Sequence, residues 1–459
     1  MKQILMNAVH MSCVGDIAHG LWTHPRDQSS RYTDLDYWAE LARTLERGCF
    51  DSLFLADIVG ANDVYEGRPD AALRAAVQMP IDDPLLLVPA MAHATRHLGF
   101  GVTANLSYEQ PYLFARRFTT LDHLSRGRVA WNVVTGFLDS AARAMGQERQ
   151  LPHDERYARA EDFMDVVYKL WEGSWEDDAL PRDKVAGVYA LPEKVHAIDH
   201  RGPYYRVQGA HLSEPSIQRT PVIFQAGASA RGIDFAARHA ECVFVSGNKA
   251  QAREIVGTIR ARAAAFGRDP ADLRFFLGVV VVVAPTDALA QELDAEYRRY
   301  ASPQAGLAHF SSQTGIDFSR YGLDEPISLV KTESVQSFVE SVTSKSAGKA
   351  WTVRKLLEQM TLGSRHTPLI GSPQRVADAL ESWVRETDID GFNLVRTVVP
   401  EGFTDFVDLV IPELQSRGSF KTTYAEGSLR HKLFGAGDRL PRRHPAGALR
   451  RAASGGAST

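Results

Sequence analysis

The sequence predicts a closed barrel of parallel strands wrapped by helices, the α/β fold called a (β/α)₈ or TIM barrel, here with insertions. Short apolar segments alternate with helix-like segments along most of the 459 residues. The apolar segments are hydrophobic throughout, which is typical of strands that helices cover on both faces. Seven or eight such units in one chain favour a closed barrel over an open, doubly wound sheet.

The predicted strands are short and mostly apolar. They are residues 4–11, 52–56, 99–104, 129–134, 221–225, 242–245, 277–283 and 391–395. Helical patterns separate them, at about 34–48, 84–97, 111–125, 153–171, 373–386 and 403–417, with two more ending near 239 and 266. In the segment 153–171, apolar residues recur at three- and four-residue steps, which predicts an amphipathic helix.

Two segments interrupt this alternation within a single predicted domain, residues 1–420. Residues 181–219 combine extended residues with turn signals and predict a hairpin excursion. Residues 301–372 are long, mixed and rich in Ser and Gly, and predict an insertion before the last strand. Residues 421–459 form a C-terminal extension, and the basic, small and proline residues of its last ~15 positions predict disorder.

Composition excludes several classes of protein. A net charge of −4 gives no electrostatic footprint for nucleic acid or an anionic membrane, and a nucleic-acid-binding tail is the less favoured alternative. No apolar run reaches the ~18 residues that span a bilayer. The N-terminus is typical of a core strand rather than a secretory signal. Cys13, Cys49 and Cys242 are scattered and odd in number, which favours a reducing, cytoplasmic setting, and no spacing resembles a metal site.

Polar residues stand at or just after the carboxyl ends of the predicted strands, where barrel enzymes place their active sites. They are His10, Cys13, Asp57, Thr103, Asn105, Asn132, Thr135 and Gln225. Each one alone is equally typical of a helix cap or a turn. The series as a whole favours a functional site.

The segment GASARG (227–232) is the candidate phosphate site. Its small residues let backbone N–H groups approach a ligand, and the N-terminus of the following helix favours an anion. It does not match the G-x-G-x-x-G dinucleotide pattern, so a mononucleotide fits better. No nucleophile, zinc-protease or P-loop motif is present, which indicates that a cofactor carries the reaction.

Six segments carry a family resemblance. They are CVGDIAHGLWTHPRDQ (13–28), YWAELARTLERGCFDSLFLAD (37–57), ARRFTTLDHLSRGRVAWNVVT (115–135), HDERYARAEDFMDVVYKLWEGSWEDDAL (153–180), QRTPVIFQAGASARG (218–232) and DGFNLV (390–395). With them the chain resembles the bacterial-luciferase-like flavin monooxygenases, in the branch of nitrilotriacetate, dibenzothiophene sulfone, dimethyl sulfide and long-chain alkane monooxygenases.

The resemblance implies a two-component, FMN-dependent monooxygenase that assembles as a homodimer or homotetramer. Reduced FMN (FMNH₂) would come from a separate NAD(P)H:flavin reductase. O₂ would add to the flavin C4a, and the resulting (hydro)peroxide would oxygenate a small organosulfur compound or a long-chain alkane. Two alternatives remain open: an F420- or flavin-dependent hydride-transfer oxidoreductase of the same superfamily, and a non-catalytic FMN-binding protein.

The resemblance also implies residue roles. Asp57, Thr103, Asn105, Asn132 and Thr135 would line the isoalloxazine and ribityl groups. The phosphate would be held by His153, Tyr157, Gly227, Ala228 and Ser229.

On the substrate side, the resemblance implies a pocket above the flavin and three candidate catalytic residues. The pocket residues are Asp16, Asn62, Gln78, Phe137 and Gln313, and the catalytic candidates are His19, Cys13 and His309. His19 would donate a hydrogen bond to the peroxide, or else cap the first loop; Cys13 would be a pocket wall or a packed small hydrophobe.

The substrate class does not transfer directly, because Asp16, Phe137 and Gln313 stand where branches of the family tend to place His. An aminopolycarboxylate ranks below the other substrates because the predicted lining has no Lys or Arg. Arg143, Arg149 and Arg156 would approach from the phosphate side only.

Overall fold

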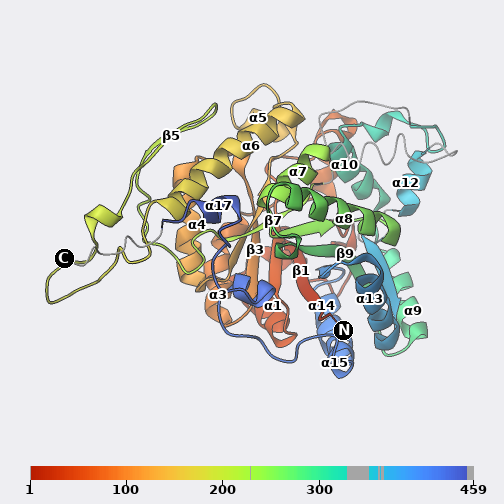
Figure 1. Cartoon of the computed structure of the whole chain (residues 1–459). Helices are drawn as coiled ribbons and strands as arrows, with labels where there is room; N and C mark the ends of the chain where they lie inside the picture. Colours follow the sequence, from red (N-terminus) through yellow and green to blue (C-terminus); the bar gives the residue numbers. More distant parts are fainter. Residues whose placement is uncertain (1, 228, 328–350, 360–361, 363–365, 452–459) are drawn as a thin grey trace.

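The computed structural model describes residues 2–227, 229–327, 351–359, 362 and 366–451. Within these residues, eight parallel strands close into a barrel with helices outside it (Figure 1). In ring order they are β1 (Leu5–Met11), β2 (Ser52–Ala56), β3 (Gly99–Asn105), β4 (Val129–Val134), β7 (Val222–Gln225), β8 (Cys242–Val245), β9 (Arg274–Val283) and β11 (Gly391–Val395). β11 pairs with β1 in register Asn7↔Asn393, which closes the ring. The predicted fold class is confirmed, and all the predicted strands are present with small shifts at their ends.

A further strand, β10 (Thr367–Gly371), pairs in parallel with the second half of β9, from Thr367↔Val279 onward. It lies within the segment predicted as an insertion, so the sequence analysis missed it. Pro368 is untypical of a strand interior, so this segment was not predicted as a strand. Proline is nevertheless tolerated in an edge strand such as β10, which pairs on one side only within the described residues. The insertion also contains α10 (Pro303–Thr314) and α12 (Val353–Gln359), while its residues 328–350 lie outside the described residues.

The helices around the barrel present one apolar face to the strands. The longer ones are α1 (Leu35–Arg47), α3 (Val88–Ala94), α4 (Pro111–Ser125), α6 (His153–Tyr168), α7 (Ala230–His239), α8 (Lys249–Ala265), α9 (Asp287–Arg298) and α13 (Pro373–Thr387). The shorter ones are α2 (Asp70–Arg74), α5 (Asp139–Ala144), α14 (Glu401–Asp405) and α15 (Ile411–Ser416), the last two joined by a π-helical turn, Phe406–Val410. A second π-helical turn, Lys169–Gly173, extends α6.

Short 3₁₀ turns connect these elements. They are η1 (Leu21–Thr23), η2 (Ser29–Thr33), η3 (Tyr65–Gly67), η4 (Pro84–Leu86), η5 (Leu106–Tyr108), η7 (Pro192–Lys194), η8 (Pro270–Asp272) and η9 (Phe318–Arg320). Several helices begin at a side-chain cap. The Asp34 carboxylate accepts from the Asp36 N–H ahead of α1, for example, and Ser229 caps α7 by accepting from the Gly232 N–H.

The barrel interior is an apolar core that a C-terminal helix covers at one end. Side chains from most ring strands, among them Val9, Phe54, Phe224 and Phe276, form one cluster with Leu429 and Leu433 of α16 (Leu429–Phe434). The Leu429 N–H donates to the carbonyl of Gly127, which lies just before β4, so α16 sits at the N-terminal end of the strands. The opposite end of the barrel is therefore the one available for a site.

The excursion (181–219) projects from the barrel, whereas the C-terminal tail packs against it (Figure 1). β5 (Ile198–Arg201) and β6 (Arg206–Gly209) form an antiparallel hairpin that projects away from it (Figure 1). The tail packs against the barrel, and its short helix α17 (Pro445–Ala448) buries Ala446 and Gly447.

The expectation of disorder was therefore wrong for residues 445–451, while 452–459 lie outside the described residues. Small side chains allow this packing, since a Cβ at Gly447 would lie 2.1 Å from the Pro441 carbonyl oxygen. The division of the chain at residue 421 stays a prediction.

In the part of the chain that the structure describes, no helix is long and apolar enough to cross a membrane. Over the same residues, no group of three or more His, Cys, Asp or Glu is arranged to hold a metal ion.

Candidate active site

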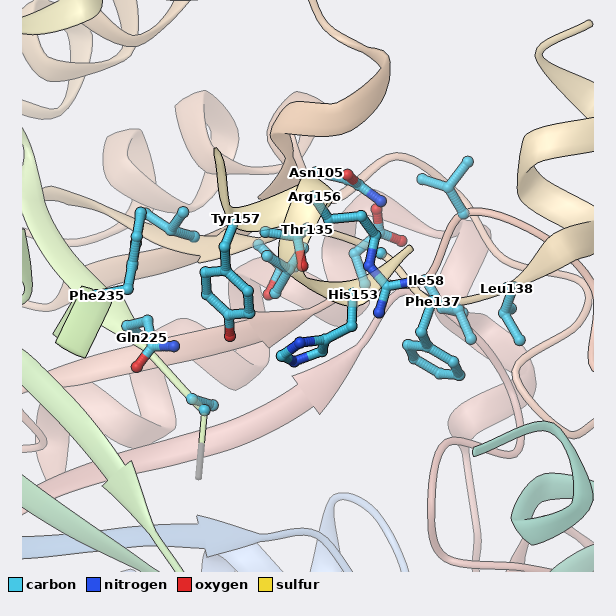
Figure 2. Close-up of a pocket in the computed structure, with 18 of the residues that line it drawn as sticks. Ile58, Asn105, Thr135, Phe137, Leu138, His153, Arg156, Tyr157, Gln225 and Phe235 are labelled. Carbon is cyan, nitrogen blue, oxygen red and sulfur yellow. The ribbon is translucent and has the colours of Figure 1, made fainter. Parts of the chain in front are cut away.

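A cavity of about 230 Å³ opens at the C-terminal ends of β2, β3, β4 and β7. Figure 2 shows Gln225, Phe235 and Tyr157 at one end of it and Phe137 and Leu138 at the other. Eight of the residues predicted to bind the cofactor line it: Asp57, Thr103, Asn105, Thr135, His153, Tyr157, Gly227 and Ser229. Segments far apart in the sequence thus converge on one space because parallel strands bring their carboxyl ends to the same face.

Hydrogen-bonding side chains gather at one end of the cavity. Ser229 caps α7, and its Oγ lies 3.2 Å from Nε2 of His153. The Tyr157 hydroxyl hydrogen-bonds with the side chains of Ser229 and Gln225, and burial raises the pKa of Tyr157, so it remains a donor at neutral pH. A Cβ at Gly227 would lie 2.4 Å from Nε2 of Gln225 and 3.0 Å from the Tyr157 hydroxyl, so a larger residue would displace these side chains.

Arg156 adds a guanidinium to the same cavity and is almost fully buried. The sequence predicted that Arg156 could approach from the phosphate side, but did not include it among the cofactor-binding residues. The segment HDERY (153–157) could have predicted this position. Residues three and four apart on a helix share a face, and His153, Arg156 and Tyr157 follow that spacing.

The middle of the cavity carries hydroxyl and amide groups. Thr103 and Asn132 are paired across β3 and β4, and Nδ2 of Asn132 donates to Oγ1 of Thr103 over 2.9 Å. Oδ1 of Asn132 is buried with no hydrogen-bond partner in the described structure. Asn132 itself does not line the cavity but lies directly behind Thr103, which does.

The loop leaving β4 passes close to Asn105. Gly136 has φ +69, and a Cβ there would lie 2.6 Å from Nδ2 of Asn105. Oδ1 of Asn105 accepts from the Ser107 N–H, which fixes the side chain, and the Ser107 hydroxyl donates to the carbonyl of Thr135. The Asn105 amide is thereby held in the cavity wall.

Asp57 follows β2 and separates the first cavity from a second one of about 380 Å³. Burial, together with a smaller effect of the nearby Asp83 carboxylate, raises the pKa of Asp57 to about 6. Asp82, Asp83 and Glu109 line the second cavity with Asp57, so this side of the site is acidic.

Most residues predicted for the substrate pocket lie elsewhere. Of that set, Phe137 lines the first cavity. The others surround the loop after β1 without lining either cavity: Cys13, Asp16, His19, Asn62, Gln78, His309 and Gln313. Ala228, predicted for the phosphate, lies outside the described residues.

This second group, which we call the β1-loop cluster, is held together by its own contacts. Asp16 faces the buried guanidinium of Arg396 over 3.6 Å. Asn62 donates to Oε1 of Gln78, and Gln78 donates to Sδ of Met11. Nε2 of His19 lies 2.9 Å from Nδ1 of His309, and Nε2 of His309 lies 2.9 Å from Nε2 of Gln313.

Burial sets the protonation of this cluster. It lowers the pKa of His19 to about 4, which makes the ring neutral at neutral pH. Burial likewise raises the pKa of Cys13 to about 12, so its thiol has no nucleophilic form there. Cys13 therefore serves packing better than covalent chemistry.

Fold and cavity together are those of a barrel enzyme, with the candidate site at the carboxyl ends of the strands. The family model described as luciferase-like monooxygenase matches residues 17–390. The chain belongs to that family.

Three similar proteins extend this finding. The dimethyl-sulfide monooxygenase of Hyphomicrobium sulfonivorans is 49% identical over 451 residues, 98% of this chain and 94% of that protein. The long-chain alkane monooxygenase of Geobacillus thermodenitrificans is 48% identical over 455 residues, 99% of each. A riboflavin lyase solved with modified FMN and riboflavin is 38% identical with a TM-score of 0.93, covering 98% of this chain and 100% of that one.

Proposed function

We propose that the chain is a two-component monooxygenase that uses reduced FMN and O₂ to oxygenate a small organosulfur compound or a long-chain alkane. The observation that carries this proposal is the cavity at the strand ends, which joins an anion cradle to a wall of amides and hydroxyls. The relatives named as dimethyl-sulfide and long-chain alkane monooxygenases support the reaction class and the two substrate classes.

The cradle fits the phosphate of FMN. His153, Tyr157, Ser229 and the backbone around Gly227 offer several donors within one turn of the N-terminus of α7, and Arg156 adds positive charge. A dianion accepts from backbone and hydroxyl donors together and is favoured by the helix dipole. Ala228 completes this predicted set.

The wall fits a flavin and its ribityl chain. A flavin presents both donors and acceptors, and the amides of Asn105 and Gln225 offer both. Oε1 of Gln225 is buried with no hydrogen-bond partner in the described structure, so it has an acceptor to offer. Asn132, also predicted for the flavin, acts through Thr103, to which its amide donates. Asp57, Thr103 and Thr135 complete the wall.

Once bound, reduced FMN supplies the electrons that activate O₂. The task of this chain is then to bind the flavin, exclude water from it and position the substrate. His19, the catalytic candidate from the β1-loop cluster, would donate a hydrogen bond, with His309 beside it. Asp16, Asn62, Gln78, Phe137 and Gln313 stay the proposed substrate residues.

The remaining partners follow from this chemistry. The sequence contains no dinucleotide-binding G-x-G-x-x-G motif, so we propose that a separate NAD(P)H:flavin reductase delivers the reduced FMN. We further propose a homodimer or homotetramer acting in the cytoplasm, where the three buried thiols would stay reduced.

The test supplies photoreduced FMN and O₂ to the purified chain and follows oxygen consumption and loss of substrate. Dimethyl sulfide, dibenzothiophene sulfone and hexadecane are offered in turn, and free reduced FMN without protein is the control. We expect one substrate to be consumed with matching oxygen use. Oxygen use no greater than with free flavin, and no substrate loss, would contradict the proposal and favour hydride transfer or non-catalytic FMN binding.

A further inference from the structure

The β1-loop cluster contains a chain of three hydrogen-bonding side chains that ends in an unsatisfied atom. Gln313 and His309 lie one turn apart on α10, and His19 lies in the loop after β1. The chain runs from Nε2 of Gln313 to Nε2 of His309 and from Nδ1 of His309 to Nε2 of His19, with both distances 2.9 Å. Nδ1 of His19 has no hydrogen-bond partner among the described residues, and His19 is 5% exposed. At the other end, Oε1 of Gln313 is also buried without a partner among those residues.

The direction of this chain is fixed at the Gln313 end. An amide NH₂ group is a donor only, so the histidine nitrogen facing it must accept. His309 then carries its proton on Nδ1 and donates it to Nε2 of His19. Since Nε2 of His19 accepts, the proton of this neutral ring is on Nδ1, the atom without a partner.

A buried donor without an acceptor costs roughly 1–3 kcal/mol of folding stability. Such a group is maintained where a ligand supplies the acceptor. His19 lies beyond the carboxyl end of β1, on the face of the barrel that carries the cavity. A sulfide sulfur or a sulfoxide or sulfone oxygen accepts a hydrogen bond, whereas an alkane offers no acceptor.

We propose that Gln313 is a positioning residue that, through His309, holds His19 with its proton on Nδ1, and that His19 donates this proton's hydrogen bond to the heteroatom of an organosulfur substrate. The role of His19 toward the substrate rests on the proposed function and chooses between its two substrate classes. The positioning role of Gln313 concerns only the hydrogen bonds within the protein.

The tautomer is measured by ¹⁵N NMR of the full-length protein with labelled histidine, and the His19 signal is assigned by its loss in His19→Asn. We expect His19 to be protonated on Nδ1. In Gln313→Glu, a carboxylate accepts from His309, which reverses the chain and moves the His19 proton to Nε2. In Gln313→Met no group directs His309, and His19 should lose its preference for one tautomer.

The matched control is Ser312→Ala on the same helix, because the Ser312 hydroxyl is buried without a hydrogen-bond partner in the described structure. Its His19 signal should equal that of the wild type. Protonation of wild-type His19 on Nε2, or an unchanged His19 signal in Gln313→Met, would overturn the positioning role.

The substrate half is tested by the ratio of kcat/KM for dimethyl sulfide to that for hexadecane. Loss of one directed hydrogen bond in Gln313→Met should lower this ratio about tenfold, while Ser312→Ala leaves it unchanged. An unchanged ratio, or turnover of hexadecane alone, would overturn the choice of an organosulfur substrate. If none of dimethyl sulfide, dibenzothiophene sulfone and hexadecane is oxygenated, the proposed function fails with it, and the tautomer measurement still decides the role of Gln313.

Discussion

Arg430 of α16 and Glu241, just before β8, form a bidentate ion pair inside the protein, with Nε–Oε1 at 2.7 Å and Nη2–Oε2 at 2.9 Å. The same guanidinium donates to the carbonyls of Gln218 and Thr220 ahead of β7, and Glu241 also accepts from the Ile223 N–H. This pair fastens the C-terminal extension across the N-terminal end of the barrel. It explains why a segment rich in basic residues belongs to the core.

Replacing Arg430 by Met should destabilise the protein by about 3–5 kcal/mol, because Glu241 would keep a buried charge without its cation. Denaturant unfolding of the cofactor-free protein measures this. Arg443→Met is the control, since Arg443 pairs with Asp272 at the exposed surface and should change stability little. Equal effects of the two variants would show that α16 does not depend on the buried pair.

The sequence predicted the ring strands well because each is a short, mostly apolar run between two helical patterns, as in 129–134. It missed β10 because Pro368 is typical of a loop unless a free strand edge is known. It missed the role of α16 because the partner of Arg430 lies 189 residues away. Contacts at such separation leave no local pattern in the sequence.

The candidate site was predictable to the same extent. The predicted cofactor residues follow strand ends and helix starts, and eight of them line one cavity. The predicted substrate residues come from loops, and nothing in the sequence says which loops reach the same space. Phe137 reaches the cavity from the loop after β4, whereas Asp16 turns toward Arg396, the residue directly after β11.

Tyr157→Phe should weaken the binding of reduced FMN by about 1–3 kcal/mol, because it removes a buried hydroxyl donor from the cradle. Anaerobic titration of the chain with reduced FMN gives the dissociation constant. Tyr205→Phe is the matched control. Tyr205 is also buried against α6, but its hydroxyl accepts from Arg159 away from the cavity. Unchanged affinity in Tyr157→Phe would remove Tyr157 from the phosphate site.

Gly232→Ala should also weaken FMN binding, since a Cβ there would lie 2.9 Å from the Tyr157 hydroxyl and 3.0 Å from the Gly227 carbonyl carbon. The cradle would have to open to admit it. Gly257→Ala in α8 is the control, because its Cβ would meet no atom within 4 Å. It should leave binding unchanged and stabilise the helix by roughly 0.5–1 kcal/mol. Wild-type affinity of Gly232→Ala for reduced FMN would show that the turn at 227–232 can move away from Tyr157 without loss of binding.

Asp57→Asn should stabilise the cofactor-free protein at neutral pH and have little effect in acid. Burial raises the pKa of Asp57 to about 6, above the value of about 3.8 that an unfolded chain would show. The native carboxyl therefore holds its proton where the unfolded one has lost it. Its contribution to stability is complete below pH ~4 and is lost as the pH rises to ~6.

The asparagine variant escapes that loss, so its advantage at pH 7 should reach at most about 3 kcal/mol and shrink as the pH falls toward 4. Unfolding free energies of both proteins at several pH values measure this. Asp287→Asn is a control of opposite sign, because hydrogen bonds from Ser372 lower the pKa of Asp287 and its carboxylate stabilises the fold only above that pKa. A stability advantage of Asp57→Asn that stayed constant from pH 4 to 7 would contradict this prediction. It would mean that Asp57 ionises normally in the folded protein and that its burial beside the two cavities does not raise its pKa.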